Sequence, residues 1–188
     1  MNSLANFFKN KDLLIYGIGK SGTACFNYLK KNNNVNIYDD KSSNIPKNFK
    51  KYSISKSKLI KKTFDNIVLS PGIDIKKCSI RKFLIKNKHK IISELDIFYL
   101  NNLNNKKITI TGTNGKSTTS KLLHDILIKH NYDVRLVGNI GNPLLLEKSI
   151  KPNTIFVIEA SSYQIEYSKY YKTDLAVILN ISPDHLER

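Results

Sequence analysis

Two glycine-rich turns, each between an apolar run and a helical pattern, constrain the fold of this chain more than any other feature. The first, GIGKSG at residues 17–22, follows the apolar run LLIY and leads into a helical pattern over residues 20–32. The second, TGTNGKST at 111–118, follows KITI and leads into an amphipathic pattern over 116–130. A strand that enters a helix through a glycine turn is the repeating step of parallel α/β sheets. The sequence therefore predicts an α/β fold.

Further apolar runs alternate with helical or loop-like segments along the chain. Strands are expected at residues 13–16, 35–40, 66–72, 90–92, 107–112, 134–138, 154–160 and 173–182. Because the glycine turn occurs twice, we expect two successive parallel-sheet domains, divided near residue 93. Residues 1–93 would form a Rossmann-like domain, and residues 94–188 would form a second domain of the P-loop type, with an incomplete sheet.

Three other segments carry specific structural predictions. Residues 41–62 are rich in Lys, Ser and Asn and should be loop with short pieces of structure, while residues 76–87 should be a helix. The segment SELDIFYL opens another helix, with Ser93 as its N-cap. In the helix over 116–130, the residues expected to face inward are Leu122, Leu123, Ile126 and Leu127.

The composition is strongly basic, with a formal charge of +16 from 28 Lys and 3 Arg against 15 acidic residues. Such a charge could attract nucleic acid or an anionic membrane. The lysines are spread over both halves, however, whereas an interface that reads bases is more often Arg-rich and clustered. No apolar run approaches the roughly 20 residues of a membrane span. We therefore expect no nucleic-acid partner and no membrane span.

The cysteines and the N-terminus favour a cytoplasmic location. Cys25 and Cys78 lie in apolar helical contexts without metal-ligand spacing, so we expect buried free thiols in a reducing compartment. The first 12 residues lack the apolar segment of a secretory signal.

The first glycine turn fits the pattern G-x-G-x-x-G of dinucleotide-binding folds. Gly17 and Gly19 would allow a tight turn and a close backbone approach, and the N–H groups at the start of the next helix would attract an anion. Asp39, 17 residues beyond Gly22, could accept hydrogen bonds from a sugar hydroxyl. The pattern does not separate NAD from another nucleotide diphosphate, and a tight turn without a ligand remains an alternative.

The second turn departs from the usual phosphate-loop pattern because Ile110 stands where the first glycine is expected. The turn nevertheless keeps the groups that bind phosphate in such loops. Gly112 and Gly115 let the backbone N–H groups point inward, Lys116 supplies a charge for the β- and γ-phosphates, and Ser117 supplies a hydroxyl for Mg²⁺. We predict that this loop binds the phosphates of a nucleotide.

Two residues downstream could complete a metal site. Glu159 ends the apolar strand TIFVIEA, and an acidic residue at the end of a strand beside a phosphate loop commonly holds Mg²⁺. His185 follows the next apolar strand and should reach the same edge of the sheet. The alternatives are a solvated glutamate and a structural histidine.

Several short stretches together resemble the Mur ligase superfamily, whose ATP loops lack the first glycine of the common pattern. Beside TGTNGKST and GIGKSG, these stretches are LSPGI (69–73), GNIGNP (138–143), EASSYQIE (159–166) and NISPDHLER (180–188). Their order and spacing are most similar to members that add D-glutamate to UDP-N-acetylmuramoyl-L-alanine in peptidoglycan synthesis. The similarity covers nearly the whole chain apart from 41–62.

The resemblance implies three groups of site residues. The UDP-sugar would be contacted by Gly17, Gly19, Lys20, Ser21, Asp39, Gly72 and Asn139. The phosphates of ATP would be held by Gly112, Thr113, Asn114, Gly115, Lys116, Ser117 and Thr118. Mg²⁺ would be held by Ser117, Glu159 and His185, and the residues with catalytic roles would be Lys116, Glu159 and His185.

The resemblance also implies the chemistry. ATP would convert a substrate carboxylate into an acyl phosphate, which the amine of D-glutamate would attack, and Mg²⁺ and Lys116 would offset the repulsion between the two anions. Because family members are much longer, this chain would lack a carbamylated lysine, most adenine contacts and an amino-acid-binding third domain. We therefore expect the 188-residue chain to be an inactive fragment by itself.

Three alternatives to the D-glutamate ligase remain open at this stage. The chain could belong to another amide ligase of the same superfamily, or it could be a nonenzymatic nucleotide-binding module. The third alternative, an NAD-dependent oxidoreductase, is suggested by the first turn but leaves Lys116 and its loop unexplained.

Overall fold

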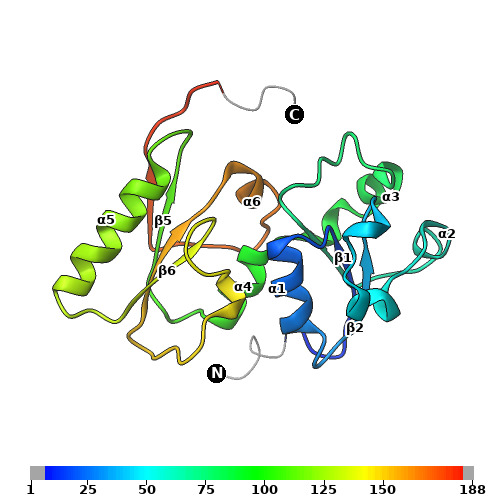
Figure 1. Ribbon diagram of the computed structural model, residues 1–188, viewed down its shortest axis with the longest axis horizontal. Coiled ribbons are helices and arrows are strands. Elements are labelled where there is room, and N and C mark those ends of the chain that lie inside the picture. The colour runs from blue at the N-terminus through cyan, green and yellow to red at the C-terminus, as the bar shows by residue number, and fades with distance from the viewer. Residues whose placement is uncertain (1–6, 184–188) are drawn as a thin grey trace.

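The computed structural model describes residues 7–183, which form two four-stranded, fully parallel sheets lying side by side (Figure 1). Each sheet contains one of the two glycine turns, between its first strand and the helix that follows. The predicted α/β class with two successive parallel sheets is confirmed.

The first sheet has the strand order β2-β1-β3-β4. Its elements are β1 (Asp12–Tyr16), α1 (Lys20–Leu29), β2 (Asn34–Tyr38), the 3₁₀ helices η1 (Ser42–Asn44) and η2 (Lys47–Tyr52), α2 (Lys56–Leu59), β3 (Asn66–Leu69), α3 (Arg81–Lys86), η3 (Lys88–Lys90) and β4 (Ile91–Ile92). The short helices between β2 and β3 agree with the prediction for residues 41–62.

The second sheet has the strand order β6-β7-β5-β8. It is preceded by α4 (Glu94–Asn101) and comprises β5 (Lys107–Thr111), α5 (Lys116–Lys129), β6 (Val134–Gly138), η4 (Leu144–Leu146), β7 (Ile155–Glu159), α6 (Ser162–Glu166) and β8 (Leu175–Ile178).

Helix α4 lies between the two sheets, and six of its eight residues are buried, including the carboxylates Glu94 and Asp96. The predicted N-cap is confirmed, because Ser93 accepts from Leu95 N and Asp96 accepts from Ser93 N in a capping box. Toward the second sheet, Phe98 of α4 packs edge to face against Phe156 of β7, with 4.8 Å between the ring centroids. One apolar core therefore runs from the first sheet through α4 into the second.

The expectation that all four apolar residues of the helix over 116–130 face inward is wrong for two of them. In α5 only Leu123 and Leu127 pack against the sheet, whereas Leu122 and Ile126 are 60% and 46% exposed. Among the described elements, the helix makes its main contacts with β5, β6 and β7. Strand β8 is exposed along its whole length as well. Because a parallel strand is normally buried on both faces, this part of the sheet is uncovered in the described part of the chain.

The helix predicted at 76–87 begins only at Arg81. The preceding residues form turns, since Ser79 donates its backbone N–H and its hydroxyl to Asp40, which draws this segment toward the end of β2. Cys25 is buried as expected, but Cys78 is only half-buried, and both are free thiols.

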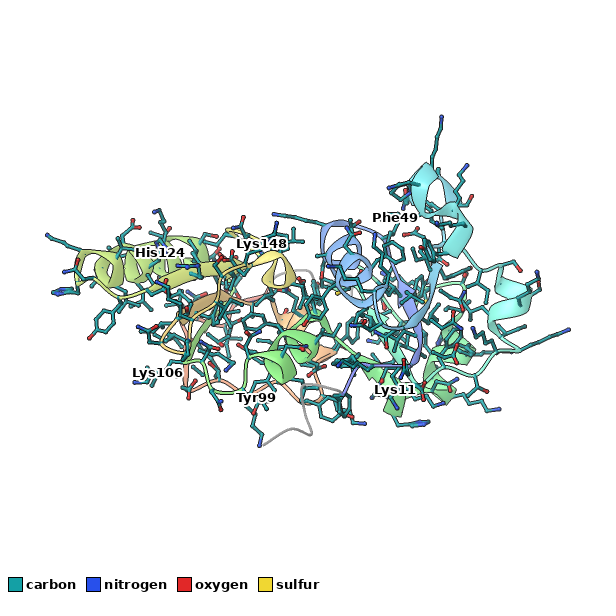
Figure 2. The ribbon with its side chains drawn as sticks, turned by 90° about the horizontal axis from the view of Figure 1, so that it is seen from below. Lys11, Phe49, Tyr99, Lys106, His124 and Lys148 are labelled. Carbon is teal, nitrogen blue, oxygen red and sulfur yellow. The ribbon has the colours of Figure 1, made fainter. Side chains whose placement is uncertain are left out.

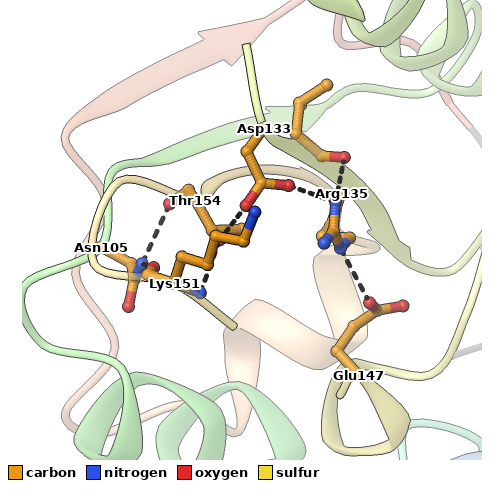
Figure 3. A network of polar contacts seen from close by, with 7 residues as sticks. Asn105, Asp133, Arg135, Glu147, Lys151 and Thr154 are labelled. Carbon is orange, nitrogen blue, oxygen red and sulfur yellow. Dashed lines mark hydrogen bonds and ion pairs between the residues drawn. The ribbon is translucent and has the colours of Figure 1, made fainter. Parts of the chain in front are cut away.

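The amino edge of the second sheet is closed by a polar network (Figure 3). Asp133 pairs with Arg135 and accepts from the hydroxyl of Thr154, whose carbonyl accepts from Asn105. These contacts hold the pKa of Asp133 below its ordinary value, chiefly through the hydrogen bond from Thr154, with Arg135 adding to the effect. The network occupies the starts of the strands and leaves their carboxyl ends open for a ligand.

The basic side chains are distributed over the molecule. Figure 2 shows Lys106 and Lys148 on one half of the molecule and Lys11 on the other, and the three lie in different connecting segments. Within residues 7–183, every helix is too short or too polar to traverse a lipid bilayer.

Candidate functional site

The first glycine turn lies at the carboxyl edge of its sheet. Strand β1 is in register with its neighbours, so that Tyr16 pairs with Tyr38 and with Leu69. The residues that follow these three strand ends, Gly17 among them, therefore meet at one place. Gly17 has φ = +86°, a conformation that favours glycine.

Close packing within the turn explains its last glycine. A Cβ on Gly22 would lie 1.9 Å from the carbonyl oxygen of Gly17, a contact with backbone that no side chain could accommodate. The same carbonyl accepts a hydrogen bond from the hydroxyl of Ser70 at 2.7 Å. Contacts within the protein thus explain Gly17 and Gly22, whereas Gly19 has an ordinary φ of -67° and a Cβ there would meet nothing within 4 Å.

Asp39 is already engaged by the protein. Its Oδ2 accepts from the N–H of Ile18 in the glycine turn at 3.1 Å, and its Oδ1 accepts from Lys41 N and from the amide of Asn44. The carboxylate of Asp39 therefore stabilises the glycine turn. A hydrogen bond from a sugar hydroxyl would be an additional contact.

A cavity of about 370 Å³ opens beside this turn. The structure brings together around it all the residues predicted to contact a UDP-sugar: Gly17, Gly19, Lys20, Ser21, Asp39, Gly72 and Asn139. Gly72 comes from the turn after β3 and Asn139 from the end of β6, so the second sheet completes a cavity that the first sheet begins.

The structure explains why the second glycine turn has Ile110 where the common phosphate-loop pattern has its first glycine. Ile110 is fully buried inside β5 and packs in the core of the second sheet, where glycine would leave a void. The turn itself is made by Gly112 at φ = +140° and Gly115 at φ = +82°. Gly115 is also the residue from which α5 starts.

Lys116 folds back over this loop. Its Nζ donates to the carbonyl oxygens of Gly112 at 2.6 Å and Thr113 at 2.7 Å. The ammonium group is therefore held above the concave side of the loop, where a phosphate would have to compete with those two carbonyls for it.

Asn180 holds the loop through three hydrogen bonds to Thr113 and Asn114. The sequence interpretation did not single this residue out. Its backbone carbonyl accepts from Thr113 N, its Oδ1 accepts from Asn114 N at 2.9 Å, and its Nδ2 donates to Asn114 O at 3.0 Å. Its position two residues after β8, on the same edge as the loop, was the available signal.

Glu159 lies directly beside the strand that leads into the loop, paired in register with Ile110. The carboxylate is 1% exposed, and its Oε1 accepts from Nδ2 of Asn139 at 3.0 Å. Its Oε2 is buried and has no hydrogen-bond partner among residues 7–183. A buried anionic oxygen without a donor is costly unless a cation or a ligand satisfies it.

A larger cavity of about 1060 Å³ adjoins the loop. Of the residues predicted to bind ATP, Gly112, Thr113 and Lys116 line it, whereas Asn114, Gly115, Ser117 and Thr118 form the outer turn and the start of α5. Three residues, Pro71, Gly72 and Asn139, line both cavities. The two glycine turns therefore face neighbouring spaces.

The predicted metal set is only partly described. Ser117 is exposed at the first turn of α5, Glu159 is buried at the end of β7, and His185 lies outside the described residues. Within the described ranges, no three His, Cys, Asp or Glu side chains gather as a ready metal cluster.

Two further residues of the first cavity were missed. Gln164 is 5% exposed, and its side chain accepts from Ser161 N in the capping box that starts α6. The S-x-x-Q spacing was a usable signal for this box. Glu94 is buried beside Ser21, and nothing in its local sequence distinguishes it from an ordinary acidic residue in the first turn of a helix.

Comparisons with known proteins agree with this geometry. A family model of the Mur ligase MurD-like N-terminal domain matches residues 11–93, and a model of the Mur ligase middle domain matches residues 110–188. The chain is 36% identical to the UDP-N-acetylmuramoylalanine--D-glutamate ligase of Rickettsia prowazekii, over 97% of this chain and 41% of that protein. The protein of the same name from Caldicellulosiruptor bescii is 36% identical over 96% of this chain and 42% of its own length.

The chain thus spans about two fifths of the length of these curated relatives. Among solved structures, a ligase from Neisseria meningitides has the same fold. It is UDP-N-acetylmuramate:L-alanyl-gamma-D-glutamyl-meso-diaminopimelate ligase, with a TM-score of 0.52 and 19% identity over 94% of this chain and 62% of that chain. Since the matched regions contain both glycine turns and both sheets, the chain belongs to the Mur ligase family, with a MurD-like N-terminal domain and a Mur ligase middle domain.

Proposed function

We propose that this chain supplies the UDP-sugar site and the ATP-phosphate site of a ligase that adds D-glutamate to UDP-N-acetylmuramoyl-L-alanine in peptidoglycan synthesis. One observation carries the proposal. The two glycine turns open onto neighbouring cavities that share Pro71, Gly72 and Asn139, so an acid substrate and a phosphate donor would lie next to each other. The division into domains at residue 93 belongs to the same proposal.

The chemistry needs such an arrangement. A carboxylate is a poor electrophile, and transfer of a phosphoryl group makes it an acyl phosphate that an amine can displace. The first cavity would orient the UDP-sugar so that its terminal carboxylate points into the second. There Lys116 would exchange its two loop carbonyls for phosphate oxygens and stabilise the charge that develops during transfer.

The residues present fit a bound Mg²⁺. Oε2 of Glu159 is the buried anionic oxygen that a hard cation would satisfy, and Asn139 holds the other oxygen so that Oε2 stays oriented. Ser117 would add a hydroxyl from α5. Mg²⁺ bound there would supply charge neutralisation for the phosphates.

Ligand-dependent thermal stability tests the assignment of the first cavity. UDP-N-acetylmuramoyl-L-alanine at a hundredfold excess over its Kd is expected to raise the Tm of the chain by about 5–10 °C, because it binds only the folded form. NADH at the same concentration should have no effect, and a shift with NADH alone would refute the assignment.

The substitution Glu159→Gln tests the metal site. In the wild-type chain, ATP should stabilise the fold more strongly with Mg²⁺ than with EDTA. The variant is expected to lose that difference, since an amide oxygen is a weaker ligand for a divalent cation than a carboxylate. Gln is isosteric, so the UDP-sugar should still bind. An undiminished Mg²⁺ dependence would remove Glu159 from the site.

A further inference from the structure

Glu94 is a buried carboxylate that the proposed chemistry does not use. It begins α4, is only 5% exposed, and lines the cavity beside the first glycine turn. Its Oε2 accepts a hydrogen bond from the hydroxyl of Ser21. Its Oε1 is buried without a hydrogen-bond partner among the described residues. The backbone N–H of Leu145 faces the carboxylate.

The surroundings of this carboxylate are poor in compensating charge. From α1 it is faced by the cation Lys20, the hydroxyl of Ser21 and the neutral thiol of Cys25, and Asp39 lines the same cavity. On the far side, η4 and α6 contribute uncharged groups, the amide of Leu145 and the side chain of Gln164. On its own helix the next acidic residue is Asp96, which is engaged by backbone amides.

Burial raises the pKa of Glu94 above its ordinary value, while Ser21, the Leu145 amide and Lys20 each lower it in part. A diphosphate at the start of α1 would bring further negative charge beside this group. Like charges disfavour ionisation, and the effect is strong where water is excluded. An ionised Glu94 would also offer the ligand acceptors only, whereas a protonated Glu94 has an O–H to donate.

We infer that Glu94 is a positioning residue that fixes the hydroxyl of Ser21 in the first cavity and takes up a proton when a diphosphate group occupies that cavity. The inference rests on the proposed function, which places the UDP-sugar there. In this role Glu94 acts through Ser21 and links the affinity for the UDP-sugar to pH. In this account the pKa of Glu94 is higher in the complex than in the free protein. Between these two pKa values the affinity for the UDP-sugar falls as pH rises. One linked proton limits the fall to about tenfold per pH unit.

Calorimetric titration of the chain with UDP-N-acetylmuramoyl-L-alanine tests this directly. Both phosphates of this ligand are esterified, so the ligand has no phosphate proton to exchange near neutral pH. Titrations in two buffers of different ionisation enthalpy give the number of protons taken up on binding. The wild-type chain should take up part of one proton. Glu94→Gln should bind within about threefold of the wild-type Kd without that uptake, because Gln keeps an acceptor for Ser21.

Two further variants separate the roles. Glu94→Ala removes the acceptor for Ser21 and should weaken binding by about tenfold or more. Asp125→Asn, which removes an exposed carboxylate on α5, should keep both the affinity and the proton uptake of the wild type. Binding by the wild type without proton uptake, or unchanged uptake in Glu94→Gln, overturns the inference and leaves the proposed function intact. Absence of binding by the wild type overturns both.

Discussion

Replacement of Lys116 by alanine is expected to lower ATP-dependent phosphate release by about 100-fold or more in a ligase that carries this chain at the length of its relatives. The ammonium group lies within 2.6 and 2.7 Å of the Gly112 and Thr113 carbonyls, on the concave side of the loop, and the chain has no second cation in that loop. Removal of one preorganised group that stabilises developing charge typically costs this much. Acyl-phosphate formation, measured in single turnover, should fall in parallel.

The same variant should bind UDP-N-acetylmuramoyl-L-alanine nearly as well as the wild type, because Lys116 lines only the larger cavity. Lys121→Ala is the matched control, since Lys121 lies on the same helix and pairs with Asp125 at the surface. Turnover should be unchanged in this control. If UDP-sugar binding fell as far as turnover in Lys116→Ala, the division of labour between the two cavities would be wrong.

Replacement of Asp96 by alanine is expected to destabilise the fold by about 3–5 kcal/mol. This carboxylate is fully buried and accepts from the backbone N–H groups of Ser93, Lys169, Tyr170 and Tyr171, at 2.6 to 2.9 Å. It fastens the segment between α6 and β8 to the start of α4, between the two sheets. Without it, four backbone N–H groups lose their acceptor. Water can replace it at the exposed Lys169, so the expected loss is well below four times the cost of one unsatisfied buried donor, which is about 1–3 kcal/mol.

Urea denaturation followed by circular dichroism gives the free energy of unfolding that tests this prediction. Asp125→Asn, an exposed carboxylate on α5, is expected to change that free energy by less than about 0.5 kcal/mol. A loss of similar size in both variants would mean that Asp96 is not the fastening point between helix and segment.

Much of the architecture follows from local sequence. Glycine at positions 17, 112 and 115 is needed for positive φ, and apolar runs of four or five residues between turns are enough to define the strands. The spacing of Ser93 and Asp96 is sufficient to indicate a capping box. Because parallel strands place their carboxyl ends at one edge, the positions of Lys116 and Glu159 on a common edge were also predictable.

How much of the apolar face of a helix is covered by neighbouring elements was not predictable. The apolar stripe of α5 is wider than the surface it packs against, so the pattern alone placed Leu122 and Ile126 inside when they are exposed. Hydrophobic periodicity reports which face is apolar, and the neighbouring elements decide how much of that face is covered.

The sequence by itself determined the fold class, the two glycine turns and the residue types around each, because these depend on backbone conformation and on the two periodicities of helix and strand. The tertiary structure alone decided which side chains from different turns meet. Asn139 joins both cavities and holds Glu159, and Glu94 reaches Ser21 across 73 positions of the chain. Such contacts depend on the docking of one sheet against the other through α4, and no local pattern encodes the distance between residues that only packing brings together.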